Sequence, residues 1–153
     1  MSINILGVDY SINGTTRLDL SNKRLKEIPI NVFELINLTY LDLDFNELTE
    51  IPIEISNSVK LETLRLNCNK LMEIPNINNL VKLKILELSY NELTSIPKEF
   101  CEMKELGFVD LSNNCIHDEE SVKIFETLKV QYKYMNDQKQ QLIELLVLPM
   151  VII

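Results

Sequence analysis

Residues 38–52 read LTYLDLDFNELTEIP, and the core of this phrase recurs along the chain. Its other copies are LDLSNKRLKEIP (18–29), LRLNCNKLMEIP (64–75), LELSYNELTSIP (86–97) and a fifth, VDLSNNCIHDE (109–119), that lacks the Ile-Pro pair. The four prolines, Pro29, Pro52, Pro75 and Pro97, are spaced by 23, 23 and 22 residues. A fixed period of this length predicts a repeat architecture in which each coil of chain stacks on the next.

The spacing of apolar residues predicts what each coil contains. Leu41 and Leu43 are two residues apart, so both point to one face of a short strand. Strands of successive coils then pair in parallel, and the proline begins a return segment where a missing N–H costs little. The return segments have an apolar period of three, as in Phe100, Met103 and Leu106, which favours a helix or a 3₁₀ turn. Stacking of the coils buries these residues in one continuous core.

The residue pattern resembles the leucine-rich-repeat family, whose consensus is LxxLxLxxNxL. The full match is Leu38-x-x-Leu41-x-Leu43-x-x-Asn46-x-Leu48, and the resemblance extends over roughly residues 15–128. It implies an α/β fold: a right-handed superhelical solenoid with a short parallel β-sheet on the concave face. Helical, 3₁₀ or irregular segments are implied for the convex face. The 22–23-residue Ile-Pro form looks like the intracellular group that includes Ras-pathway scaffolds and phosphatase-targeting subunits.

We expect one domain with three parts: an N-terminal cap (1–14), about five repeats (15–117), and a C-terminal cap helix with an apolar tail (118–153). Ile3, Ile5 and Val8 are candidates to cover the open face of the first coil, because the ends of a repeat stack must be capped. Acidic residues at 118–120 predict the start of a helix. A closing strand over 130–134 and a last helix over 136–146 are expected beyond it.

The final segment, LLVLPMVII (145–153), is apolar and uncharged. It is about half as long as the roughly 20 residues that a membrane-spanning helix needs. The favoured interpretation is that it packs on the last coil. Self-association, contact with a membrane surface, and a missing next element of a longer chain remain as alternatives.

The overall charge excludes one large class of partner. The chain has 15 basic and 23 acidic residues, a net charge of −8, so nucleic acid is not expected to bind. Three cysteines do not make a disulfide framework, and the N-terminus lacks the pattern of a secretory signal. A cytoplasmic or nuclear setting is therefore expected.

An asparagine follows the strand in four of the five coils, at Asn46, Asn69, Asn91 and Asn114. The family resemblance implies that these side chains bond the backbone of the turns along the stack. A buried amide requires such pairing. They are interpreted as a structural ladder and not as catalytic residues. The first coil has Lys23 at this position, which suits a terminal coil with one neighbour.

The non-leucine positions of the strands form the concave face, and they combine acidic with aromatic residues. The candidate partner-binding residues are Tyr40, Asp42, Asp44, Phe45, Arg65, Glu87, Tyr90, Phe108 and Asp110. Aromatic anchors surrounded by charge are typical of protein interfaces. Five strands at about 4.8 Å spacing span about 20 Å, which suits a helix, a loop or one face of a small domain. The structural alternative is that the acids keep the sheet soluble and neighbours cover the aromatics.

Chemistry-bearing residues are scarce. His117 and Cys115 are neighbours in a turn without an orienting third group, and two ligands are too few for zinc. No glycine-rich phosphate loop occurs, so neither catalysis nor a cofactor is expected. The sequence favours a non-catalytic protein-interaction module, a signalling adaptor or scaffold. The alternatives are a regulatory subunit or inhibitor of an enzyme, such as a phosphatase or small GTPase, and the recognition domain of a larger enzyme.

Overall fold

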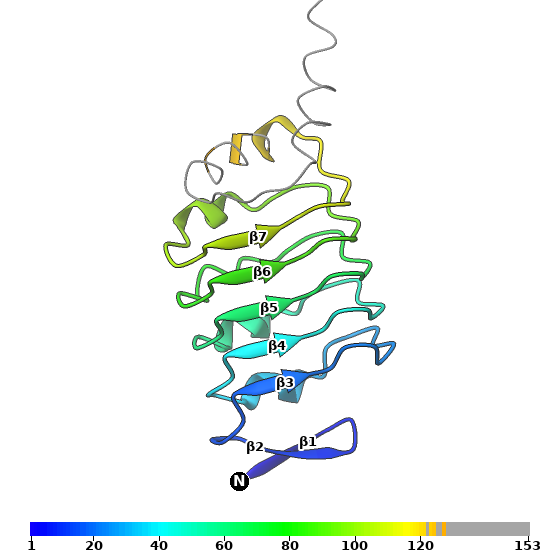
Figure 1. Ribbon diagram of the computed structural model, residues 1–153, viewed down its shortest axis with the longest axis vertical. Helices are drawn as coiled ribbons and strands as arrows, with labels where there is room; N and C mark the ends of the chain where they lie inside the picture. The colour runs from blue at the N-terminus through cyan, green and yellow to red at the C-terminus, as the bar shows by residue number, and fades with distance from the viewer. Residues whose placement is uncertain (122, 125–126, 128–153) are drawn as a thin grey trace, which may run out of the picture.

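The computed structural model describes residues 1–121, 123, 124 and 127, and Figure 1 shows these residues as a stack of coils. Each coil contributes one strand to a five-stranded parallel sheet in the order β3-β4-β5-β6-β7. The strands are β3 (Arg17–Asp19), β4 (Tyr40–Asp42), β5 (Thr63–Arg65), β6 (Ile85–Glu87) and β7 (Phe108–Asp110). Sequence order and sheet order agree, and the predicted solenoid with its parallel sheet is confirmed.

The register of the sheet follows the repeat residue for residue. Leu41 pairs with Leu18 on one side and Leu64 on the other, and Leu86 pairs with Val109. These central residues of the strands are buried. Their neighbours in each strand point the opposite way, because side chains alternate along a strand. The leucines therefore form the core, and the flanking positions form the open face of the sheet.

The convex side consists of short 3₁₀ helices. They are η1 (Ile30–Glu34), η2 (Ile53–Asn57) and η3 (Lys98–Glu102), and each begins directly after an Ile-Pro proline. Proline fits this place because its fixed φ favours the first turn and no N–H is required there. The coil after Pro75 is one residue shorter and forms only turns, with Ile77 and Leu80 still buried. The convex segments thus match the predicted mixture of 3₁₀ and irregular structure.

The N-terminal residues form an antiparallel hairpin, β1 (Ser2–Ile5) and β2 (Val8–Ser11), below β3 in Figure 1. The hairpin turn uses positive φ values at Leu6 and Gly7, as tight hairpin turns require. Ile5 is buried and Ile3 packs against the core, so both cover the first coil. The expectation for Val8 was wrong: it lies at the end of the hairpin beside the turn, and 52% of its surface is exposed.

A helix begins after Asp118, where residues 119–121 are helical. The Asp118 carboxylate accepts a hydrogen bond from the Ser121 backbone N–H (2.8 Å), and the buried Ser121 hydroxyl accepts one from the Ile96 N–H (2.8 Å). These bonds attach the helix start to the fourth coil. The expected strand over 130–134, the last helix over 136–146 and the packing of the 145–153 tail lie outside the described residues.

One polar residue interrupts the convex core. Ser58 occupies the position that Leu35, Leu80 and Met103 fill in the other coils, and its buried hydroxyl has no hydrogen-bond partner in the described structure. We predict that Ser58→Ala raises the free energy of unfolding by about 1 kcal/mol, because an unpaired buried hydroxyl is lost. Chemical denaturation of the two proteins measures the change. An equal or lower stability of Ser58→Ala would contradict this account.

Candidate functional site

The concave face is built from two residues of each strand and one residue just beyond it. The positions before the buried centre are Arg17, Tyr40, Thr63, Ile85 and Phe108; those after it are Asp19, Asp42, Arg65, Glu87 and Asp110. The parallel register sets members of each row side by side, as in the pairs Asp42–Arg65 and Arg65–Glu87. Most of these side chains are half-buried, so they pack against their neighbours and the face is a rigid surface.

Arg65 is the centre of an ion-pair network on this face. Its Nη2 lies 2.6 Å from Asp44 Oδ2 and 3.4 Å from Glu87 Oε2, and its Nε lies 3.4 Å from Asp42 Oδ2. Burial alone would lower the pKa of the guanidinium, but the hydrogen bond and charge of Asp44, with Glu87 and Asp42, raise it above its ordinary value. Arg65 therefore remains charged and holds three carboxylates together.

The buried carboxylate in this network is Asp44, whose side chain is 4% exposed. Its Oδ1 accepts a hydrogen bond from the Asn67 backbone N–H (2.7 Å), while Arg65 donates to its Oδ2. Asn67 continues the network: its Nδ2 donates to Glu87 Oε2 (2.7 Å), and its Oδ1 accepts from the N–H and hydroxyl of Ser89. Asp44 is thus an internal support of the face and not a group exposed to a partner.

The aspartates of the strands also have a structural role. One carboxylate oxygen of Asp19, Asp42 and Asp110 accepts the backbone N–H two residues later, at 2.9–3.0 Å. Hydrogen bonds from the Ser21 hydroxyl and N–H lower the pKa of Asp19. These bonds fix the backbone where each strand ends, in the manner of an Asx turn. The acidic residues therefore shape the sheet as well as charging it.

At the N-terminal end of the face, Arg17 stacks on Tyr40. The guanidinium carbon lies 3.8 Å from the centre of the ring, and the Tyr40 hydroxyl donates to Asp42 Oδ2 (2.9 Å). Burial raises the pKa of Tyr40, as do the hydrogen bond and charge of Asp42. Tyr40 is consequently a neutral hydrogen-bond donor. At this end of the face, Arg17, Tyr40 and Asp42 contact one another.

Phe45 and Tyr90 lie at the edge of the face where the strands end, and both are well exposed, by 57% and 59%. They have left-handed backbone conformations, with φ of 56°, a position that Asn22 and Asn113 occupy in the terminal coils. A bulky residue is disfavoured there, at a cost of about 1 kcal/mol or more, whereas asparagine tolerates it. Neither packing nor backbone geometry accounts for two exposed aromatic residues at this edge.

The residue between these aromatics in the column is Cys68, which has the same left-handed backbone conformation. Burial raises the pKa of its thiol, and the Asp44 charge adds to this. The thiol is therefore protonated at neutral pH and is a poor nucleophile. Cys68 adds apolar surface between Phe45 and Tyr90 and no reactive group.

The four asparagines lie next to this edge and face inward. Asn69 is representative: its Nδ2 donates to the carbonyls of Leu43 (3.0 Å) and Leu66 (3.1 Å), and its Oδ1 accepts from the Leu48 N–H (3.0 Å). Asn46, Asn91 and Asn114 make the corresponding bonds in their own coils. Each side chain thus joins its own turn to that of the preceding coil.

The structure adds concave residues that the sequence analysis did not select. Asn67 and Ser89 belong to the Arg65 network, and Thr63 and Ile85 complete the row that contains Tyr40 and Phe108. The sequence feature that could identify them is their position in the repeat, which is equivalent to that of the acidic and aromatic candidates. Thr63, Asn67 and Ile85 are half-buried on this surface, whereas Ser89 is buried beneath it.

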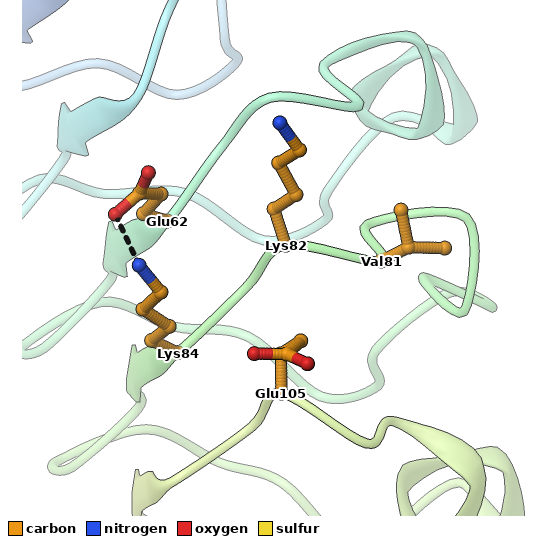
Figure 2. Close-up of a pocket in the computed structure, with 5 residues that line it drawn as sticks. All are labelled: Glu62, Val81, Lys82, Lys84 and Glu105. Atoms are coloured by element: carbon orange, nitrogen blue, oxygen red, sulfur yellow. Dashed lines mark hydrogen bonds and ion pairs between the residues drawn. The ribbon is translucent and has the colours of Figure 1, made fainter.

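A shallow hollow of about 460 Å³ lies at the opposite edge, where the chain enters the strands. Figure 2 shows the ion pair of Glu62 and Lys84 on one side of it and Val81 on the other. Lys82 and Glu105 lie between these two sides in this view. The hydrogen bond and charge of Lys84 lower the pKa of Glu62, and Glu62 raises that of Lys84. Both groups stay charged at neutral pH, so they do not form an acid–base pair for catalysis.

The described part of the chain contains no cluster of three or more His, Cys, Asp or Glu residues that fits a metal ion. No helix within it has the length and apolar content required to cross a membrane. Cys115 and His117 are both exposed at a turn. The described residues therefore present a structured open face, and no metal-type cluster lies within them.

A stack of parallel coils with an open, structured concave face defines a solenoid repeat protein. The sequence profile described as Leucine rich repeat matches residues 13–71 and 59–116, which is more than half of the chain. The chain belongs to the leucine-rich-repeat family. Domains of this family are generally protein-interaction modules and are typically non-catalytic. A comparison with curated protein sequences gave no match.

Solved structures with the same fold come from several sources. A leucine-rich-repeat protein of Leptospira interrogans is 36% identical, with a TM-score of 0.65 over 71% of this chain and 28% of its own. The leucine-rich-repeat domain of APL1B is 28% identical, with a TM-score of 0.63 over 67% of this chain and 33% of its own. The corresponding domain of a Shigella effector is 28% identical, with a TM-score of 0.56 over 70% and 44%. The chain matches less than half the length of each.

Proposed function

We propose that this protein is a non-catalytic adaptor or scaffold that binds another protein on its concave face. The observation that carries the proposal is the exposed pair Phe45 and Tyr90 at the edge of a rigid, charged sheet. Both residues have a backbone conformation that disfavours aromatic side chains. Aromatic residues beside a polar rim provide much of the binding energy of protein interfaces.

We also propose a more specific role in intracellular signalling. It is based on the Ile-Pro form of the 22–23-residue repeats, which is similar to that of intracellular members of the family. The same surface would serve a regulatory subunit or inhibitor of an enzyme. The identity of the partner separates these roles: an adaptor joins two or more proteins, whereas a regulator binds one enzyme and changes its activity.

The test is a double variant, Phe45→Ala/Tyr90→Ala. We predict that its free energy of unfolding stays within about 0.5 kcal/mol of the wild type, because both side chains are exposed. Affinity capture from cell lysate, followed by mass spectrometry, is expected to lose the specific partner. The matched control is Ile53→Ala/Val81→Ala, which removes exposed apolar side chains elsewhere on the surface and should retain it. A partner kept by the aromatic variant and lost by the control would move the site off the concave face.

A further inference from the structure

The two halves of the concave face differ in how their charges are balanced. On β3–β5 the face contains its own cations: Arg17 stacks on Tyr40, and Arg65 lies between carboxylates of the second and fourth coils. The corresponding surface on β6 and β7 has no lysine or arginine at positions 85, 87, 89, 108, 110 or 112. The cationic side chains of the face are thus confined to its first three strands.

The carboxylates on β6 and β7 are direct neighbours. Glu87 and Asp110 are register partners in the parallel sheet, so two like charges lie on adjacent strands about 4.8 Å apart. Asp110 has one oxygen bonded to the N–H and hydroxyl of Ser112, and no ion pair is formed by it in the described structure. Like charges in directly opposed positions are unfavourable, and a cation between them removes the repulsion. In the preceding coils Arg65 provides that cation between Asp42 and Glu87.

Apolar surface lies beside this pair. Ile85 and Phe108 are register partners on the same two strands, and both are only half-buried. Tyr90, 59% exposed, lies just past the end of β6. An unpartnered sheet face that combines two apolar side chains, an exposed aromatic ring and two adjacent carboxylates is complementary to a segment with a basic side chain next to an apolar one.

We propose that the β6–β7 half of the concave face binds a segment of the partner protein that carries lysine or arginine. The basic side chain lies between Glu87 and Asp110, as Arg65 lies between Asp42 and Glu87. An adjacent apolar side chain of the segment packs on Ile85 and Phe108 at the start of the two strands, and Tyr90 borders the carboxylates on the opposite side. This inference rests on the proposed function, since it specifies which part of the concave face binds and what chemistry the partner offers there.

The probe is a phage-displayed library of random peptides of about 12 residues, selected on the whole purified chain. Enriched peptides are then synthesised, and their Kd is measured by fluorescence polarisation. We expect them to carry lysine or arginine beside an apolar residue. The test variant is Glu87→Gln/Asp110→Asn, which keeps the hydrogen-bond acceptors used by Asn67 and Ser112 and removes the two charges. It is expected to weaken binding about 10-fold or more.

The matched control is Glu50→Gln/Glu73→Gln, which makes the same change in net charge at two exposed positions outside the face. Its affinity and its melting temperature should stay close to those of the wild type, with affinity within roughly twofold. The Glu87→Gln/Asp110→Asn variant also loses the Glu87–Arg65 ion pair, so its Kd is measured well below its own melting temperature. Raising the salt from about 50 to about 500 mM NaCl should weaken the wild-type complex more than the Glu87→Gln/Asp110→Asn complex, because ions screen the charges.

Three other outcomes would overturn this inference, and the first of them leaves the proposed function in place. Neutral or acidic peptides that lose affinity for Phe45→Ala/Tyr90→Ala but not for Glu87→Gln/Asp110→Asn would overturn the cationic segment and leave the concave site in place. Peptides that bind every variant equally would overturn both. A selection that returns no enriched peptide would also overturn this inference, which requires a linear basic segment to bind by itself.

Discussion

Replacement of Arg65 by methionine is expected to lower the free energy of unfolding by about 2–4 kcal/mol. The guanidinium donates two hydrogen bonds to the buried carboxylate of Asp44 and also contacts Asp42 and Glu87. Breaking a fully buried ion pair by removing one partner costs about 3–5 kcal/mol. The Arg65 side chain is 36% exposed, so solvent screening reduces that figure. Three carboxylates would remain close together without the cation that holds them.

Equilibrium denaturation with urea measures this loss. The matched control is Arg17→Met, which removes the other arginine of the concave face; it stacks on an aromatic ring and should cost about 0.5–1 kcal/mol. Adding Asp44→Asn to Arg65→Met should recover part of the stability, because the buried charge then disappears. A loss below about 1 kcal/mol, or no recovery in the double variant, would show that the network adds little to the fold.

The repeat explains why so much of the fold could be predicted from the sequence. A leucine such as Leu41 has the same neighbours in every coil, so one local pattern specifies strand, register and core together. The Ile-Pro pair likewise marks the start of each 3₁₀ segment. Such rules hold because a repeat protein has mainly contacts between adjacent coils.

Side-chain pairing on the concave face was less predictable. The register alone places Arg65 between Asp42 and Glu87, but Asp44 joins the network because the chain turns there and buries its carboxylate. The exposure of Phe45 depends on a left-handed backbone, which the aromatic residue does not predict and which only the asparagines at the same position of the terminal coils, Asn22 and Asn113, indicate. Val8 shows the same limit at the N-terminus, where the hairpin turn, and not the apolar character of the residue, sets its exposure.

These details change which concave residues are expected to contact a partner. Asp44 is buried, and Asp42 and Arg65 are held by their own network, so their substitution would affect stability before binding. The side chains of Phe45, Tyr90 and Asp110 make fewer contacts within the protein. Variants of the second group therefore test binding, and variants of the first group test the scaffold that presents it.

The second large effect is expected from Asn69→Ala, with a loss of about 1–3 kcal/mol in the free energy of unfolding. Asn69 as a residue is 8% exposed. Its side-chain amide joins two coils: the oxygen accepts a hydrogen bond from the Leu48 N–H, and the nitrogen donates to the carbonyls of Leu43 and Leu66. Alanine leaves these buried backbone groups without a partner, and each unpaired group carries a desolvation cost. Methyl-sized replacement of the amide also leaves a small void beside the leucine core.

We expect the loss in the free energy of unfolding to depend on how deeply the asparagine is buried in its coil. Asn114→Ala, in the last coil, is therefore the comparison for Asn69→Ala. Asn114 makes the same types of bond to Leu88, Leu93 and Leu111, but it is only half-buried, so water can reach the groups that it leaves. We expect its replacement to cost less than that of Asn69 in the same urea titration. Equal losses at both positions would mean that burial does not determine the contribution of the ladder. A loss at Asn69 below about 0.5 kcal/mol would mean that the turns keep their geometry without it.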